Sequence, residues 1–131
     1  MLTIKVEENF EYALEQLGIT APIGSLVMTM CDGELLMGVG IMRLFDSYAV
    51  IDGIYIKEEF ADFSLEYGMG KSMLNVVDLR GLRHAVCSNT DMERVLKSLR
   101  FKKTSEIAEV PQELTEYGYY LNLTGYFDAN C

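Results

Sequence analysis

The chain has 131 residues, half of them hydrophobic, and carries a formal net charge of −9 at pH 7. This length suits one domain with a real hydrophobic core, and the hydrophobic content argues against intrinsic disorder. The acidic balance makes nucleic acid and anionic membranes poor partners. The longest apolar run, Leu35–Met42, is too short to span a bilayer. We therefore expect a single domain over residues 1–131 that binds neither nucleic acid nor membrane.

The cysteines are Cys31, Cys87 and Cys131, widely spaced and without a Cys-x-x-Cys pair. His84 is the single histidine, so no zinc-binding motif can be assembled and we expect no metal. Three unpaired cysteines indicate a reducing compartment. Because Met1–Phe10 lacks the pattern of a secretory signal, the sequence predicts a cytoplasmic protein.

The first predicted elements are a short strand and a helix. Leu2–Val6 alternates as a strand does, and Asn9 is the expected cap of the helix that follows. Gly18 stands just past the expected end of that helix. The apolar face of the helix comprises Phe10, Ala13, Leu14 and Leu17.

Three antiparallel strands are predicted next. Ser25–Met30 and Leu35–Leu44 form a hairpin, because the Asp32-Gly33 dipeptide between them is a strong turn signal. Ala49–Ile56 is the third strand. Gly38 and Gly40 in the second of these strands are expected to mark a bulge or close packing. Six methionines are expected to fill the core: Met28, Met30, Met37, Met42, Met69 and Met73.

Two glycines, Gly68 and Gly70, precede a predicted helix whose buried face contains Met69, Met73 and Val77. Glycines at the start of a helix let the backbone approach a ligand, and the first turn offers unpaired N–H groups. The pattern therefore favours an anion site suited to a phosphate. The alternative is that the glycines only make a tight turn between loop and helix.

The segment GMGKS, residues 68–72, also resembles the end of a nucleotide-binding P-loop. That motif needs a glycine at the position that Leu65 occupies, so we exclude a P-loop.

The last third of the chain predicts a short strand at Arg83–Ser88 and a helix at Asp91–Arg100. Thr90 and Glu93 match a capping box at the start of this helix. Two closing strands are expected at Ser105–Val110 and Tyr119–Thr124. Antiparallel hairpins followed by a β-α-β unit predict an α+β fold built on one mixed sheet.

Two motifs in this order resemble the GNAT superfamily of acyl-CoA N-acyltransferases. LEYGMG, residues 65–70, aligns with the phosphate loop Arg/Gln-x-x-Gly-x-Gly/Ala of that family. Asn89–Phe101 aligns with its second motif, with Asn89, Val95 and Phe101 at matching positions. The resemblance implies a short, divergent member with a central, mostly antiparallel sheet of six or seven strands flanked by helices.

The resemblance also implies acetyl-CoA as the acyl donor. Backbone groups of Ile54, Tyr55 and Ile56 would contact the pantetheine arm and the thioester, and Asn89 would contact the pantetheine arm. The amide donors to the pyrophosphate would come from Gly68, Met69, Gly70, Lys71 and Ser72.

Several residues depart from the family pattern. Leu65 replaces the Arg or Gln of the phosphate loop, and Leu96 replaces the tyrosine that protonates the departing thiolate in many members. Arg100 replaces a glycine, and one helix rather than two fits between the first two strands. The loop before the glycines is acidic, which disfavours a pyrophosphate; its acidic residues are Glu58, Glu59, Asp62 and Glu66.

Asp52 and Tyr55 are the catalytic candidates. Asp52 is the single charge within an apolar strand, and it is either a general base or a bulge aspartate bonded to backbone N–H groups. Tyr55 is either the acid or a sheet aromatic. The tail tyrosines either line an acceptor pocket or pack on the sheet; they are Tyr117, Tyr119 and Tyr120.

We therefore expect transfer of an acetyl group from acetyl-CoA to a small-molecule or peptide amine by direct attack. A homodimer is possible. The first alternative is a weak or inactive GNAT-like module that binds acyl-CoA or a protein partner, and the second is a small assembly protein that keeps only the fold. If the protein is an acetyltransferase, Leu96→Tyr is expected to be tolerated.

Overall fold

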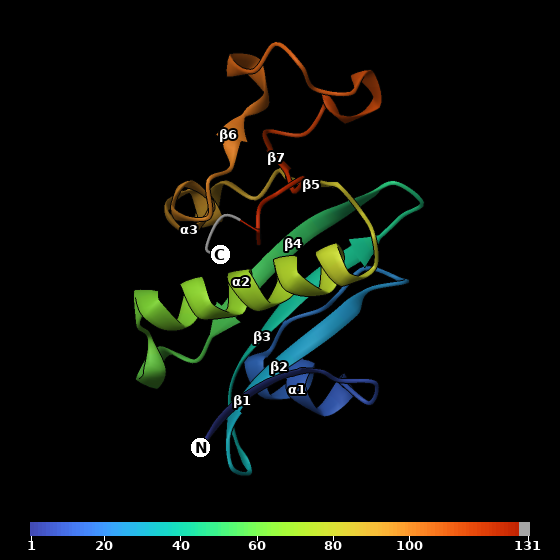
Figure 1. Ribbon diagram of the computed structural model, residues 1–131. Coiled ribbons are helices and arrows are strands. Elements are labelled where there is room, and N and C mark those ends of the chain that lie inside the picture. The colour runs from blue at the N-terminus through green and yellow to red at the C-terminus, as the bar shows by residue number, and fades with distance from the viewer. Residues whose placement is uncertain (129–131) are drawn as a thin grey trace.

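The structure is a computed structural model that describes residues 1–128. Its strands form one seven-stranded sheet with the order β1-β2-β3-β4-β5-β7-β6, in which only β4 and β5 pair in parallel (Figure 1). The predicted mixed sheet with flanking helices is confirmed. The strands are β1 Leu2–Val6, β2 Leu26–Asp32, β3 Leu35–Leu44, β4 Tyr48–Ile56, β5 His84–Cys87, β6 Lys102–Lys103 and β7 Tyr119–Asn122.

Three α-helices flank this sheet within the described residues. The longest, α2 at Phe63–Leu79, runs across one face with α3, Glu93–Ser98, beside it (Figure 1). The short helix α1, Glu11–Leu17, packs against the other face at β3. Single 3₁₀ turns complete the structure: η1 Glu58–Phe60, η2 Thr90–Met92, η3 Thr104–Glu106 and η4 Gln112–Leu114. None of the helices in residues 1–128 combines the length and apolar character needed to cross a bilayer.

Methionines fill the core between α2 and the sheet, as predicted. Met30, Met42, Met69 and Met73 are completely buried, Met28 is nearly so, and Met37 is half-buried against the same cluster. A Cβ atom on Gly40 of β3 would lie 2.6 Å from the Met73 sulfur, so this glycine lets α2 approach the sheet closely. The expected close packing at Gly40 is confirmed.

The predicted start of the glycine helix is wrong. Helix α2 begins at Phe63 and not at Gly70, and Asp62 caps it by accepting a 2.8 Å hydrogen bond from the Ser64 N–H. An N-cap aspartate satisfies a backbone donor that would otherwise lack a partner. Both glycines therefore lie inside the helix, although glycine costs about 1 kcal/mol there relative to alanine.

Two other predicted caps also differ. The cap position of α1 is Phe10, which makes no side-chain cap, and Asn9 lies outside it. At η2 the cap is Asn89, whose Oδ1 accepts a hydrogen bond from the Asp91 N–H, and no Thr90–Glu93 capping box forms. The Glu93 carboxylate instead accepts a hydrogen bond from the Tyr119 hydroxyl.

The predicted strand at Ser105–Val110 is also wrong, whereas its partner is confirmed as β7. The segment after β6 folds into η3, η4 and their connections instead. Ile107, Val110 and Leu114 use their apolar side chains to cover Val50 and Val86 on the sheet face opposite α2. Burial of this small cluster stabilises the segment without strand pairing.

Candidate functional site

Strands β4 and β5 separate after a short parallel contact. Their three pairs are Tyr48 with His84, Ala49 with Ala85, and Val50 with Val86. Beyond Val50, β4 continues to Ile56 while β5 ends at Cys87. The edge of β4 from Ile51 to Ile56 that faces away from β3 therefore has no strand partner among the described residues.

Asn89 spans this separation. Its Nδ2 donates a 3.0 Å hydrogen bond to the Asp52 carbonyl oxygen, and its Oδ1 caps η2. The Asn89 side chain thus fixes the start of η2 against β4 and uses one donor and one acceptor position of its amide within the protein. Its expected contact with a pantetheine arm stays a prediction.

Apolar side chains close the space between β4, α2 and α3. Leu96, Leu99 and Met92 come from the α3 side, and the space that remains is too narrow for a water molecule. Leu96 is completely buried. A tyrosine at position 96 would have to displace its neighbours, so the expectation that Leu96→Tyr is tolerated does not fit this packing.

The glycine segment does not offer backbone amides to a ligand. Gly68, Met69, Gly70, Lys71 and Ser72 lie well inside α2, where each N–H bonds to a carbonyl of the preceding turn. The prediction of a pyrophosphate site on these amides therefore has to be corrected. The helix begins at Phe63, before the glycines, so their amides are not the unpaired amides of a helix start.

Gly70 has a packing role instead. A Cβ atom at this position would lie 2.6 Å from Leu99 Cδ1, so the missing side chain allows α2 and α3 to pack closely. A Cβ atom on Gly68 would meet nothing within 4 Å. The Lys71 ammonium lies 4.6 Å from the centre of the Tyr126 ring and 5.2 Å from that of Phe127, where it makes cation–π contacts.

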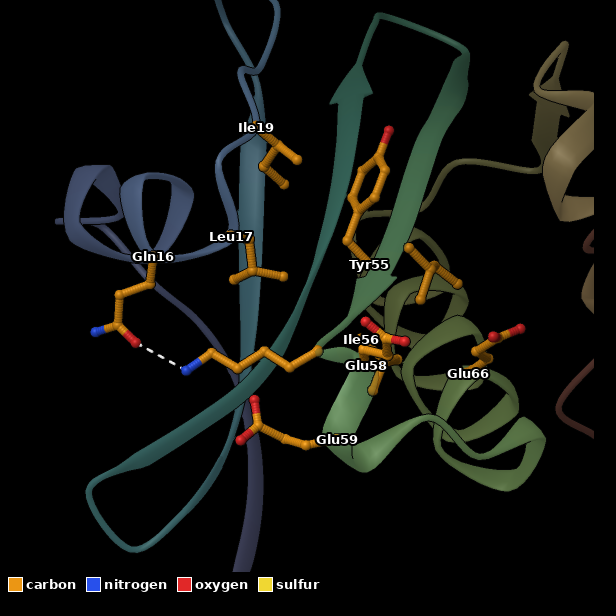
Figure 2. Close-up of a pocket in the computed structure, with 10 residues that line it drawn as sticks. Gln16, Leu17, Ile19, Tyr55, Ile56, Glu58, Glu59 and Glu66 are labelled. Carbon is orange, nitrogen blue, oxygen red and sulfur yellow. Dashed lines mark hydrogen bonds between the residues drawn. The ribbon is translucent and has the colours of Figure 1, made fainter.

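An acidic cavity of about 580 Å³ lies at the carboxyl end of β4 (Figure 2). The end of α1, the end of β4, η1 and the first turns of α2 contribute to its wall. Glu58, Glu59 and Glu66 line it, and Lys57 is its single basic side chain. The Lys57 Nζ donates a 3.0 Å hydrogen bond to the Gln16 side-chain oxygen. The volume is within the range of small-molecule sites.

Tyr55 also lines this cavity and is 36% exposed. Its ring lies back over Gly53, where a Cβ atom would come within 2.5 Å of it. In Figure 2 the Tyr55 hydroxyl points away from Glu58 and Glu59. From the sequence, the acidic loop is predicted only to repel a pyrophosphate, and the cavity is not predicted. The signal for it is the run of acidic residues after β4.

No protein-family model matches the sequence, and no curated protein matches it in a sequence search. Solved structures do match the fold. An acetyltransferase from Bacillus subtilis in complex with CoA is 15% identical, with 94% of this chain and 99% of that one covered at a TM-score of 0.69. A GNAT family acetyltransferase from Elizabethkingia anophelis with acetyl-CoA bound is 12% identical, with coverages of 93% and 98% and a TM-score of 0.64.

A spermidine/spermine N-acetyltransferase from Vibrio cholerae is 10% identical, with 100% of both chains covered at a TM-score of 0.69. The chain has the GNAT fold. At these identities the likeness concerns the fold, and the chemistry must be argued from the residues.

Asp52 occupies a bulge in the β4 strand of this GNAT fold. Ile41 pairs with Gly53 and Met42 with Ile51, so Asp52 is the extra residue. Its two carboxylate oxygens accept hydrogen bonds from the Arg43 guanidinium at 2.9 and 2.8 Å. The bond to Asp52 raises the pKa of Arg43.

This geometry agrees with one part of the sequence-based interpretation of Asp52 as a bulge residue and differs from another. The residue does lie at a bulge, but its carboxylate binds Arg43 rather than backbone N–H groups. With both oxygens engaged, the carboxylate braces β3 against β4. Its role as a general base stays a prediction.

The tail tyrosines do not line the acidic cavity. Tyr119 and Tyr120 are buried, and the Tyr120 hydroxyl lies 2.7 Å from His84 Nδ1. The Tyr117 ring lies 6.3 Å from that of Tyr48. Packing on the sheet, the second of the two interpretations, fits these positions.

Cys87 is the last residue of β5, at the point where β4 and β5 separate, and it is fully buried. Burial raises the pKa of its thiol to about 11, so the thiolate that a nucleophile needs is scarce near neutral pH. A covalent acyl intermediate on Cys87 is therefore disfavoured, in agreement with direct attack.

We predict that Cys87 resists a thiol reagent such as Ellman's reagent at pH 8 until the protein unfolds. The measurement uses a Cys131→Ser background, in which half-buried Cys31 is the other thiol. One thiol should react in native protein and two in denaturant. Rapid reaction of Cys87 in the native protein would contradict its assignment as an inert core residue.

Proposed function

We propose that this protein transfers an acyl group, most simply acetyl, from acyl-CoA to an amine. The observation that carries the proposal is the unpaired edge of β4 that leads into the acidic cavity. The GNAT fold and CoA-bound structures of similar fold support the choice of donor. The cavity supports the choice of acceptor.

The donor would lie along β4. An extended pantetheine arm can hydrogen-bond to the free backbone groups of Ile54 and Ile56 as an added strand does, whereas those of Tyr55, between them, face β3. The pyrophosphate cannot use the amides inside α2, so side chains must bind it. Arg94 is a candidate, since its guanidinium lies 4.1 Å from the centre of the Phe63 ring at the start of α2. Its planar group can form paired hydrogen bonds with a phosphate.

The acceptor would be a diamine or polyamine. Carboxylates stabilise the ammonium form of a bound amine, and an ammonium has no lone pair with which to attack. An acceptor with two amino groups avoids this conflict, because Glu58, Glu59 and Glu66 hold one as ammonium while the other reacts as neutral amine. The Vibrio cholerae enzyme of the same fold is named for such substrates.

The reaction would be a direct transfer. The nitrogen lone pair attacks the thioester carbonyl carbon, the C–N bond forms, and the C–S bond breaks with its electron pair leaving on sulfur. β4 backbone groups polarise the carbonyl. The thiolate takes a proton from Tyr55 or water, and the new amide loses a proton to water or to Asp52, if Arg43 releases it.

The acidic cavity gives the proposal its sharpest test. Glu59→Gln/Glu66→Gln is expected to lower kcat/KM for a diamine such as spermidine by about tenfold or more, since each carboxylate contributes up to about 1 kcal/mol. A monoamine of similar length should lose much less. Glu109→Gln, at an exposed residue outside the cavity, is the matched control. Equal losses for both substrates would place the acceptor elsewhere.

A binding module without chemistry is the second candidate. It is favoured by the burial of Leu96 and by the engagement of the amides of residues 68–72 inside α2. Calorimetric titration with CoA and turnover with an amine panel separate the two. Binding without turnover would support the module, and absence of CoA binding would remove both and leave a protein that keeps only the fold.

A further inference from the structure

The start of α2 is already occupied by the protein's own groups. The Asp62 carboxylate accepts a 2.8 Å hydrogen bond from the Ser64 N–H, and the Asp62 carbonyl oxygen accepts from the N–H groups of Leu65 and Glu66. The hydrogen bonds from Ser64 lower the pKa of Asp62, so its carboxylate is ionised at neutral pH. A carboxylate therefore stands where the first turn of a helix would otherwise bind a phosphate.

The two parts of a CoA molecule fit this chain unequally. Its pantetheine arm can add to the free edge of β4 at Ile54 and Ile56. Its pyrophosphate would meet the Asp62 carboxylate at the start of α2, close in the chain to Glu58 and Glu59 of η1. A donor that presents the same arm on a single phosphodiester carries less negative charge and is repelled less.

A basic surface is formed by residues 94–103, in a chain whose net charge is −9. This segment has no acidic residue and holds five of the eleven basic ones, all of them exposed: Arg94, Lys97, Arg100, Lys102 and Lys103. The three lysines line one surface hollow of about 310 Å³. Glu93 lies within 4.0 Å of Lys97 and Lys103 and offsets part of the charge. The surface as a whole remains positive and suits an acidic partner.

This basic surface adjoins the free edge of β4. The Arg94 guanidinium lies 4.1 Å from the centre of the ring of Phe63, the first residue of α2. On the buried side of α3, Leu96 lines the same narrow space as Ile54 of β4. Figure 1 shows α3 beside the first half of α2, with β6 following it. An arm bound along β4 would therefore reach the protein surface beside these cations.

We propose that the preferred acyl donor is an acidic carrier protein, which bears the acyl group on a phosphopantetheine arm and docks on the basic surface of residues 94–103. The inference rests on the proposed acyl transfer and names the partner that supplies the arm; acyl-CoA is then a weaker donor through the same arm. Arg94 would bind the phosphodiester, and the lysines would pair with carboxylates of the carrier.

The chemical step is unchanged by the new donor. The amine nitrogen forms the C–N bond, and the C–S bond breaks with its electron pair leaving on the sulfur of the arm. The proton lost by the amine balances the one taken up by the thiolate, so the carrier leaves with a free thiol.

The test compares three acetyl donors with spermidine as the acceptor: acetyl-CoA, free S-acetyl-phosphopantetheine, and a fatty-acid acyl carrier protein acetylated on its arm. The carrier should give a kcat/KM at least about tenfold above that of either small donor. A carrier no better than the free arm, or a preference for acetyl-CoA over both, would overturn the proposal. If no donor is turned over, the acyl-transfer proposal fails. Calorimetric titration with the acetylated carrier then decides the docking, and absence of binding would overturn it.

Lys97→Glu/Lys102→Glu should lower kcat/KM with the carrier by about tenfold or more, and much less with the free arm, which has no acidic surface. Lys5→Glu/Arg80→Glu makes the same change in net charge at two exposed positions outside residues 94–103 and is the matched control. Equal losses in both variants would overturn docking at this surface.

The parent protein offers a test that needs no variant. Raising the ionic strength from about 0.01 M to about 0.15 M shortens the screening length from about 30 Å to about 8 Å. The kcat/KM with the carrier should fall by about tenfold or more, and that with free S-acetyl-phosphopantetheine by much less. An equal response of the two donors would overturn the proposal, even if the lysine variant fails to fold.

Discussion

Gly70→Glu is expected to lower the free energy of unfolding by about 3–5 kcal/mol, the cost of an uncompensated buried charge. Gly70 is buried, and even a Cβ atom there would lie 2.6 Å from Leu99 Cδ1. A glutamate would have to separate α2 from α3 or push its carboxylate into the apolar core. Chemical denaturation followed by circular dichroism measures the loss.

Gly68→Glu is the matched control, because it adds the same side chain to the same helix at a half-buried position with open space around it. Glutamate forms helices better than glycine, so this variant should be at least as stable as the parent. Comparable losses at both positions would contradict the packing role of Gly70. Loss of CoA binding in Gly70→Glu would not locate a phosphate site, since the fold itself would be damaged.

Asp52→Ala and Arg43→Ala are each expected to lower the free energy of unfolding by about 1.5–3 kcal/mol, the range for hydrogen bonds to charged groups. The two hydrogen bonds between these side chains are short, and the pair is only partly exposed. The double variant should be little less stable than either single variant, because both lose the same interaction. Fully additive losses would show that the ion pair does not brace the bulge.

Asp52→Asn, compared with Arg43→Ala, tests the catalytic prediction for Asp52. If Asp52 is the general base, Asp52→Asn should lower kcat by about 10²–10⁴-fold, whereas Arg43→Ala leaves the carboxylate in place and should cost much less. Equal, small effects on kcat would leave Asp52 with the structural role alone. Stability measured in parallel separates unfolding from a lost proton acceptor.

The sheet could be predicted because its signals are local. Alternating residues and the Asp32-Gly33 turn identify the hairpin, and the observed β3 has the predicted bounds, Leu35–Leu44. Strand β4 differs from its prediction by one residue, since it begins at Tyr48. The order of elements then restricted the topology to one mixed sheet.

The start of α2 was mispredicted because the residue that requires a glycine at position 70 is distant in the sequence. Only Leu99, almost thirty residues later, shows that the glycine serves helix packing. The local signal that did mark the start was Asp62 with Ser64 after it. Glycines tolerated inside a helix and glycines that begin one look alike in sequence until the packing partner is known.

The candidate site was predicted only in part, because some of its contacts are also not local in the sequence. The resemblance predicted that backbone groups of residues 54–56 are available to a ligand, and this stretch does lie at the free edge of β4, beside a cavity. The Arg43–Asp52 pair joins different strands across a bulge, and the wall of the acidic cavity combines Gln16 of α1 with Glu59 of η1. Such contacts depend on tertiary arrangement, which periodicity and spacing do not encode.

Because of the methionines beneath α2, the sensitivity of this chain to oxidation depends on whether the chain has already folded. A sulfoxide in place of the buried thioether of Met30, Met42 or Met73 would add a polar oxygen to a cluster made of hydrophobic side chains. These sulfur atoms are shielded once the helix has docked, whereas Met1 is 97% exposed. The chain is therefore most vulnerable to peroxide while it is being synthesised and before α2 covers the sheet.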